Sequence, residues 1–220
     1  MTELVRAGQG HVVDQESGLL FRVGQSFWLA LPLILTGNLH MFAVKHNWFA
    51  RLNIPIDRGR MLSGRRILGD HKTWRGVIVM TLFGGLFGAL VGCTGGPWAQ
   101  SSGVAPLAYD VVGGGHTAPS LALGYAIINA VLGLAYVIGE LPNSIIKRRL
   151  DVPSGKTPRG MRGLFFLLVD QADSALAVLL TAVLLFGLSW HTFAVGMVSL
   201  PLLHFVFNVL LYAFRIRRNL

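Results

Sequence analysis

The sequence predicts an all-α protein that crosses a membrane about five times, and three observations support this. Of its 220 residues, 53% are apolar and only 13% are charged, and the mean hydropathy is +0.57. Soluble domains carry about 25% charged residues, so the composition excludes an ordinary cytosolic enzyme, a coiled coil and a disordered chain. Five apolar segments approach or exceed the roughly 20 residues that a bilayer-spanning helix requires. Of the 19 basic residues, finally, 17 lie in alternate connections between these segments or after the last segment.

We expect the five spans at residues 26–44, 77–94, 120–140, 164–189 and 192–214. The residues before Ser26 are interrupted by charges and lack a sustained apolar core, so they do not form a secretory signal peptide. We therefore expect residues 1–25 to form a segment outside the membrane, and residues 26–220 to form one membrane-embedded domain.

The second span carries three glycines at intervals of four, Gly84, Gly88 and Gly92. Small residues at this spacing let two membrane helices approach closely. Helix packing is the favoured interpretation of this stripe, with a substrate slot as the alternative.

The distribution of the basic residues predicts the orientation of the chain. Of the 19 Lys and Arg residues, eight lie between the first two spans, six between the third and fourth, and three after the fifth. The connections at 95–119 and 190–191 contain none. Because basic connections remain cytoplasmic, the amino terminus is expected outside and the carboxyl terminus inside, in a multi-pass protein of the cytoplasmic (inner) cell membrane.

The same distribution explains the formal net charge of +9 without a nucleic acid partner, since most of the charge lies in membrane-flanking loops. The single cysteine, Cys93, excludes an intramolecular disulfide and a multi-cysteine zinc site. The oligomeric state stays open, a homo-oligomer included.

Two carboxylates near the start of the fourth span require an explanation, because ionisable groups inside a membrane are costly and usually functional. Asp170 and Asp173 are three residues apart and so share one face of a helix. Two neighbouring anions need a cation, and a hard divalent ion such as Mg²⁺ suits carboxylate oxygens and substrate phosphates. The alternative is a span that begins after Asp173 and leaves both carboxylates at the membrane surface.

Basic residues flank these carboxylates on the same side of the membrane. Glu140 ends the third span and is followed by Lys147 and Arg148. Residues in this position are often only topology anchors, but carboxylates that hold a metal beside Lys and Arg are also what polyphosphate transfer requires.

A second basic cluster lies in the loop between the first two spans, in the sequence GDHKTWRG at 69–76. Glycines beside Lys, Thr and Arg suit a backbone that approaches phosphate closely. The segment is not a phosphate-binding loop of the Walker type, because no glycine directly precedes Lys72 and no strand precedes the segment. Electrostatic binding of anionic lipid head groups is the simpler alternative.

These segments resemble a known family. The sequence PID at 55–57, followed by GRRILGDHKTWRG at 64–76, resembles the first-loop motif of the CDP-archaeol synthases. The sequence SIIKR at 144–148, followed by DQAD at 170–173, is similar to a signature that this family shares with the phosphatidate cytidylyltransferases. The resemblance extends from about residue 26 to the carboxyl terminus, and Glu140 stands where the family typically has Asp.

The resemblance implies a Mg²⁺-dependent transfer from CTP, in which a lipid phosphate attacks the α-phosphorus and pyrophosphate is released. The lipid would be a diether phosphate resembling archaetidate, or phosphatidate. Carried onto this sequence, the metal ligands are Asp170 and Asp173 with Glu140 as a possible third, and Lys147 acts in catalysis beside the two aspartates. The expected substrate-binding residues are Asp70, Lys72, Thr73, Arg75, Ser144 and Arg148. Among them, Lys147 and Arg148 are expected to hold the CTP phosphates, and Lys72 with Arg75 the lipid phosphate or the triphosphate.

Two other functions compete with this one. A non-enzymatic carrier or flippase for phospholipids could use the same basic loops, and would show no dependence on CTP. A lipid-phosphate phosphatase would release inorganic phosphate without a nucleotide.

Overall fold

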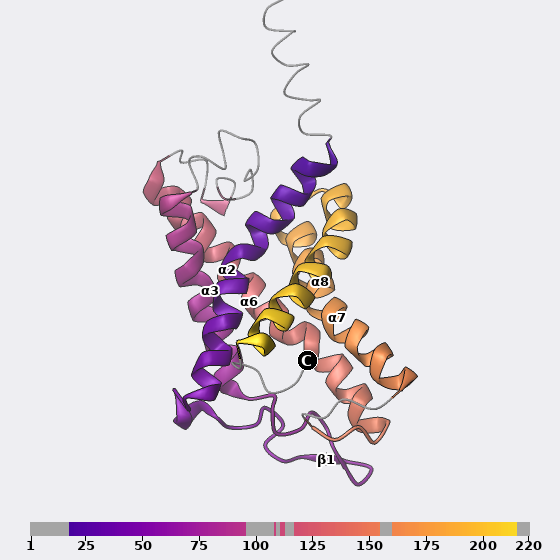
Figure 1. Cartoon of the computed structure of the whole chain (residues 1–220). Coiled ribbons are helices and arrows are strands. Elements are labelled where there is room, and N and C mark those ends of the chain that lie inside the picture. The colour runs from indigo at the N-terminus through magenta and orange to yellow at the C-terminus, as the bar shows by residue number, and fades with distance from the viewer. Residues whose placement is uncertain (1–17, 96–107, 109–110, 113–116, 155–159, 215–220) are drawn as a thin grey trace, which may run out of the picture.

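Five long helices account for most of the computed structural model, which describes residues 18–95, 108, 111–112, 117–154 and 160–214. In chain order they are α2 (Leu19–Lys45), α3 (Trp74–Thr94), α6 (Ala118–Arg149), α7 (Met161–Phe186) and α8 (Trp190–Ala213) (Figure 1). All five are long and apolar enough to cross a membrane. The prediction of an all-α protein with five spans is confirmed.

Several helix ends differ from the predicted ones. Helix α2 begins at Leu19 and not at residue 26, and the Arg22 guanidinium near its start donates to Ser189 Oγ at 3.2 Å. Helix α6 continues past residue 140 to Arg149, because backbone hydrogen bonding does not stop where the apolar run stops. Residues 1–17 lie outside the described part of the chain, so the extramembrane amino-terminal segment stays a prediction.

The turn between the last two helices lies at residues 187–189 and not at 190–191. Gly187 adopts a left-handed conformation (φ +73°) that ends α7, a role for which glycine is favoured because it lacks a Cβ. Ser189 then caps α8, its hydroxyl accepting from the Thr192 backbone amide at 3.1 Å.

The glycine stripe of α3 packs directly against α6. A Cβ placed on Gly84 would lie 2.7 Å from the backbone oxygen of Asn129, and one on Gly88 would lie 2.4 Å from that of Tyr125. These glycines therefore serve helix packing, which was the favoured interpretation. The helices form a closed ring in the order α3, α6, α7, α8, α2 and back to α3.

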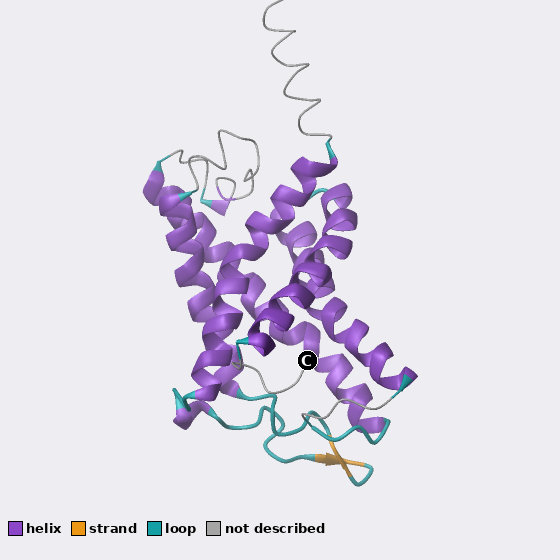
Figure 2. Cartoon of the chain, in the orientation of Figure 1, coloured by secondary structure: helices purple, strands orange, loops and turns teal. Residues whose placement is uncertain are grey.

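The loop between α2 and α3 lies at the end of the bundle where α6 ends and α7 begins, which we call the basic end (Figure 1). This loop contains a short 3₁₀ helix, η1 (Ala50–Leu52), and a hairpin of β1 (Met61–Leu62) and β2 (Arg65–Arg66). In the hairpin, Met61 pairs with Arg66 and Leu62 with Arg65. The hairpin supplies the only strands among the described residues (Figure 2). Which end of the bundle faces the cytoplasm stays a prediction.

Candidate active site

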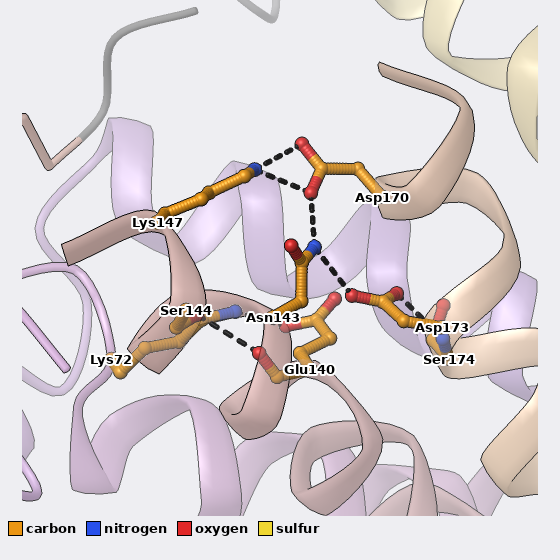
Figure 3. A network of polar contacts seen from close by, with 8 residues as sticks. All are labelled: Lys72, Glu140, Asn143, Ser144, Lys147, Asp170, Asp173 and Ser174. Carbon is orange, nitrogen blue, oxygen red and sulfur yellow. Dashed lines mark hydrogen bonds and ion pairs between the residues drawn. The ribbon is translucent and has the colours of Figure 1, made fainter. Parts of the chain in front are cut away.

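An ion pair between α6 and α7 forms the centre of a polar network at the basic end (Figure 3). The ammonium group of Lys147, in the last turn of α6, contacts both carboxylate oxygens of Asp170 and lies 2.5 Å from Oδ2. It also lies 5.3 Å from the centre of the Phe166 ring. The Lys147 side chain is 15% exposed and that of Asp170 is 42% exposed. The pair is therefore covered on the lysine side and open on the carboxylate side.

Asn143 links the two predicted metal ligands. Its amide nitrogen donates to Asp170 Oδ1 at 2.5 Å and to Asp173 Oδ2 at 2.9 Å (Figure 3). The other oxygen of Asp173 accepts from the backbone amide of Ser174 at 2.6 Å. Two carboxylates three residues apart on one helix face repel each other, so a donor shared between them stabilises their close approach. Asn143 is buried. The sequence around it does not indicate that it bridges the two aspartates.

A second ion pair brings the first loop to α6. Lys72 Nζ contacts Glu140 Oε2, and both side chains are one-quarter exposed. Glu140, Asn143 and Lys147 follow one another on α6 at spacings of three and four residues, which places them on one helix face. Residues from the first loop, α6 and α7 therefore meet at one site.

The site holds two close ion pairs, Lys147 with Asp170 and Lys72 with Glu140, and a third carboxylate, that of Asp173. Each member of such a pair can exchange its partner for a ligand that carries a charge of the same sign as that partner. A phosphate can replace the carboxylate on a lysine, and a divalent cation can replace the lysine on a carboxylate. The arrangement is thus suited to a polyphosphate that binds together with a cation.

The donor set fits a hard divalent cation at the two aspartates. Asp170 and Asp173 supply carboxylate oxygens, and the buried Oδ1 of Asn143 finds no hydrogen-bond donor within the described residues. Oxygen donors of this kind are those that Mg²⁺ selects. No group of three His, Cys, Asp or Glu side chains in the described part of the chain is arranged to hold a metal, and Glu140 is paired with Lys72.

Three of the other predicted substrate-binding residues lie in the first loop or at the start of α3. Asp70 is exposed and pairs with Arg66 at 2.7 Å. Thr73 is buried and pairs with Pro55 in an isolated β-bridge. Arg75 is buried and donates to the Trp48 backbone oxygen at 3.3 Å. None of these three contacts joins the network of Lys147 and Asp170.

The two remaining predicted residues lie on α6. The hydroxyl of Ser144 donates to the backbone oxygen of Glu140 at 2.9 Å, so it bonds to its own helix (Figure 3). Arg148 lies beside the first loop, its Cδ 3.8 Å from the position that a Cβ of Gly69 would occupy. Arg148 thus lies in the last turn of α6 and beside the first loop.

Asp57 organises the first loop, although the sequence gives it only a place in the loop motif. Its carboxylate accepts from the backbone amides of Gly59, Leu68 and Gly69 at 3.0, 3.0 and 3.2 Å, and from Arg66 Nη2 at 2.8 Å. Burial would raise the pKa of Asp57, but these hydrogen bonds outweigh it and hold the pKa well below its ordinary value. The hydrogen bond to Asp57 in turn raises the pKa of Arg66.

Comparison with known proteins identifies similar sequences along almost the whole chain. A family model described as CarS-like, CDP-archaeol synthase, matches residues 25–219. The CDP-archaeol synthase of Halorubrum lacusprofundi is 31% identical over 90% of this chain and 96% of its own length. That of Pyrococcus furiosus is 31% identical over 86% and 92%, and that of Methanopyrus kandleri is 28% identical over 94% and 98%. No solved structure is significantly similar to the chain.

Proposed function

Because this chain belongs to the CDP-archaeol synthase family and is thus a CTP-dependent cytidylyltransferase of lipid synthesis, we propose that its lipid substrate is a diether phosphate resembling archaetidate. The name of the relatives supports a diether lipid over phosphatidate. The five apolar helices make it a multi-pass membrane protein, and the alternating basic connections support the cytoplasmic cell membrane as its location.

The observation that carries the proposed site is the pairing of Lys147 with Asp170 across two helices. Lys147 exchanges this carboxylate for the CTP phosphates, and Arg148, the next residue, contributes a second charge. A charge-assisted hydrogen bond is about twice as strong as a neutral one. The exchange therefore anchors the triphosphate without leaving an unpaired charge on the lysine.

Asp170 and Asp173 hold Mg²⁺ in this proposal, with Asn143 keeping the two side chains together. Bound there, the ion would neutralise charge on the phosphates as the leaving group forms. Glu140 contributes by pairing with Lys72, and it is the carboxylate proposed as a third ligand. The support is the oxygen-rich donor set at the end of α6 and the adjoining turn of α7.

In the reaction, an oxygen of the lipid phosphate forms a bond with the α-phosphorus of CTP. The bond from the α-phosphorus to the oxygen that bridges it to the β-phosphorus breaks, and pyrophosphate leaves with that oxygen. No residue needs to act as a general base, because a phosphate monoester is already largely ionised near pH 7, its second pKa being about 6. Lys72, delivered by the first loop, stabilises the lipid phosphate as the cytidylyl group is transferred.

A side-by-side assay tests the choice of lipid. The purified full-length protein is given radiolabelled CTP, Mg²⁺ and either a diether or a diacyl lipid phosphate of matched chain length. Label in the organic phase together with released pyrophosphate is expected with the diether. Equal or faster labelling of the diacyl lipid would overturn the proposed substrate and leave the family's reaction in place.

A further inference from the structure

The last residue of α6, Arg149, attaches the hairpin of the first loop to the end of that helix. Its Nη1 donates to the backbone oxygen of Leu62 at 2.5 Å, and its Nη2 donates to those of Arg65 and Arg66 at 3.2 and 2.8 Å. These three carbonyls lie on both strands of the hairpin. One guanidinium group therefore fixes the position of the whole hairpin relative to α6.

Arg65 completes the attachment in the opposite direction. It donates to the backbone oxygen of Arg149 at 2.5 Å and to Asp151 Oδ2 at 2.7 Å. The Arg65–Asp151 ion pair is exposed, with side chains 44% and 70% accessible, and exposed pairs of this kind contribute little. The attachment of the hairpin therefore depends mainly on the three carbonyls that Arg149 binds. The rigid fork of a guanidinium group can bind several acceptors at once, which a lysine cannot reproduce.

The position of the hairpin is transmitted to Lys72 through Asp57. Arg66 of the hairpin binds the Asp57 carboxylate, and the same carboxylate holds the amide of Gly69. Gly69 has φ +100° and lies so close to Ser154 that a Cβ would be 2.9 Å from its hydroxyl oxygen. Three residues later, Lys72 reaches Glu140 in the active site.

We propose that Arg149 is a positioning residue that places Lys72 at the active site, and that it does not itself bind substrate. The basic run of Lys147, Arg148 and Arg149 is thereby divided between two tasks. Successive residues of a helix point about 100° apart. Lys147 contacts Asp170 in the site, while Arg149 holds the loop. The inference rests on the proposed function for the role of Lys72.

The first arm of the test measures the hairpin directly. Spin labels on Met61→Cys and Met161→Cys, both strongly exposed positions, are introduced into full-length protein that carries Cys93→Ala. Double electron–electron resonance is expected to give a narrow distribution of distances between the two labels when the native Arg149 is present. The distribution should broaden in both Arg149→Ala and Arg149→Lys, because neither variant can bind all three carbonyls. Arg162→Ala, which removes an exposed arginine at the start of α7, should leave the distribution unchanged.

The second arm is a double-mutant cycle on kcat/KM with Lys72→Met. Arg149→Ala alone is expected to lower kcat/KM about 10- to 100-fold, as misplacement of a substrate-positioning group does. In the Lys72→Met background, Arg149→Ala should lower kcat/KM by less than about twofold, because a residue that acts only by positioning Lys72 has no further effect once Lys72 is removed. Arg149→Lys should show the same pattern and replaces the alanine variant if that variant does not fold.

An unchanged distance distribution in both Arg149 variants would overturn the inference. So would a full loss of activity from Arg149→Ala in the Lys72→Met background, which would make Arg149 a substrate ligand in its own right. Full activity of Lys72→Met alone would instead overturn the role proposed for Lys72, while the spin-label distances still report whether Arg149 holds the loop.

Discussion

Lys147 on α6 and Asp170 on α7 neutralise each other, with Nζ 2.5 Å from Oδ2. The two groups proposed to bind the nucleotide and the metal are therefore each other's partner when neither ligand is bound. In that proposal, a cation on Asp170 would free Lys147 for a phosphate, and a phosphate on Lys147 would free Asp170 for a cation. By thermodynamic linkage, each ligand is then expected to raise the affinity for the other.

Replacing Lys147 with alanine is expected to raise the KM for CTP by about 10- to 100-fold, the equivalent of the 1.5–3 kcal/mol that a hydrogen bond to a charged group contributes. Initial rates over a range of CTP concentrations at saturating Mg²⁺ measure this change. Arg162→Ala, which also removes a basic residue from the basic end, is the matched control. A fall in kcat with an unchanged KM would show that the contact forms only in the transition state, and an unchanged kcat together with an unchanged KM would remove Lys147 from the CTP site.

The aspartates are tested by Asp170→Asn and Asp173→Asn, which remove the charge and keep the size. Turnover is expected to fall by at least about two orders of magnitude in each, comparable to the loss of a strong electrostatic stabiliser. Size-exclusion profiles and thermal unfolding establish that each variant is folded. Near-normal turnover in both variants would make the pair structural.

Asn143 provides a prediction that separates positioning from folding. Asn143→Ala removes the donor shared by Asp170 and Asp173, so the two carboxylates are expected to separate and bind a cation less well. The Mg²⁺ concentration for half-maximal activity should rise by about tenfold, the equivalent of about 1.4 kcal/mol, which is close to the lower limit of the roughly 1.5–3 kcal/mol that a hydrogen bond to a charged group contributes. Titration with Mn²⁺ followed by electron paramagnetic resonance reports the same affinity without turnover. A lower thermal midpoint with unchanged ion dependence would contradict this role.

The sequence predicts the number of spans and the paired aspartates for physical reasons. A bilayer imposes long apolar runs, and a carboxylate such as Asp170 within one is costly enough to be conspicuous. The ends of α6 could not be predicted in the same way, because the helix continues through Pro142 and the basic run after the apolar residues stop. Asn143 and Ser144 both fit a helix face shared with Glu140, and only the three-dimensional arrangement shows that Asn143 reaches α7 while Ser144 bonds back to its own helix.

The network around Asp57 depends even more on tertiary structure. Its partners come from three separate points of the loop, and the strongest of them, Arg66, lies in a two-residue strand. Strands this short carry no periodic pattern. From the sequence alone, a basic loop beside a membrane is therefore interpreted as an electrostatic surface. The structure shows instead that Arg66 binds Asp57 within the loop.

The lowered pKa of Asp57 predicts a pH dependence of stability. Because the pKa is lower in the folded protein than in the unfolded chain, the ionised form stabilises the fold. This contribution is complete above the unfolded value of about 3.9 and is lost as the pH falls below it toward the folded value. Thermal midpoints of the native protein and Asp57→Asn are expected to differ by a constant amount at pH values well above 4, and the difference should shrink progressively as the pH falls below about 4. A difference that does not shrink below that pH would show that Asp57 does not carry the effect.

The orientation of the bundle is tested by cysteine labelling in intact cells. Because 17 of the 19 Lys and Arg residues lie in connections predicted to be cytoplasmic, the hairpin end should be inside and the turn between α7 and α8 outside. In a Cys93→Ala background, His191→Cys, an exposed position next to that turn, should react with a membrane-impermeant maleimide. Met61→Cys, exposed on the hairpin, should react only after the membrane is permeabilised. Labelling of Met61→Cys, but not of His191→Cys, in intact cells would show that the topology is the reverse of the predicted one. The active site would then face outward, away from the cytoplasmic CTP.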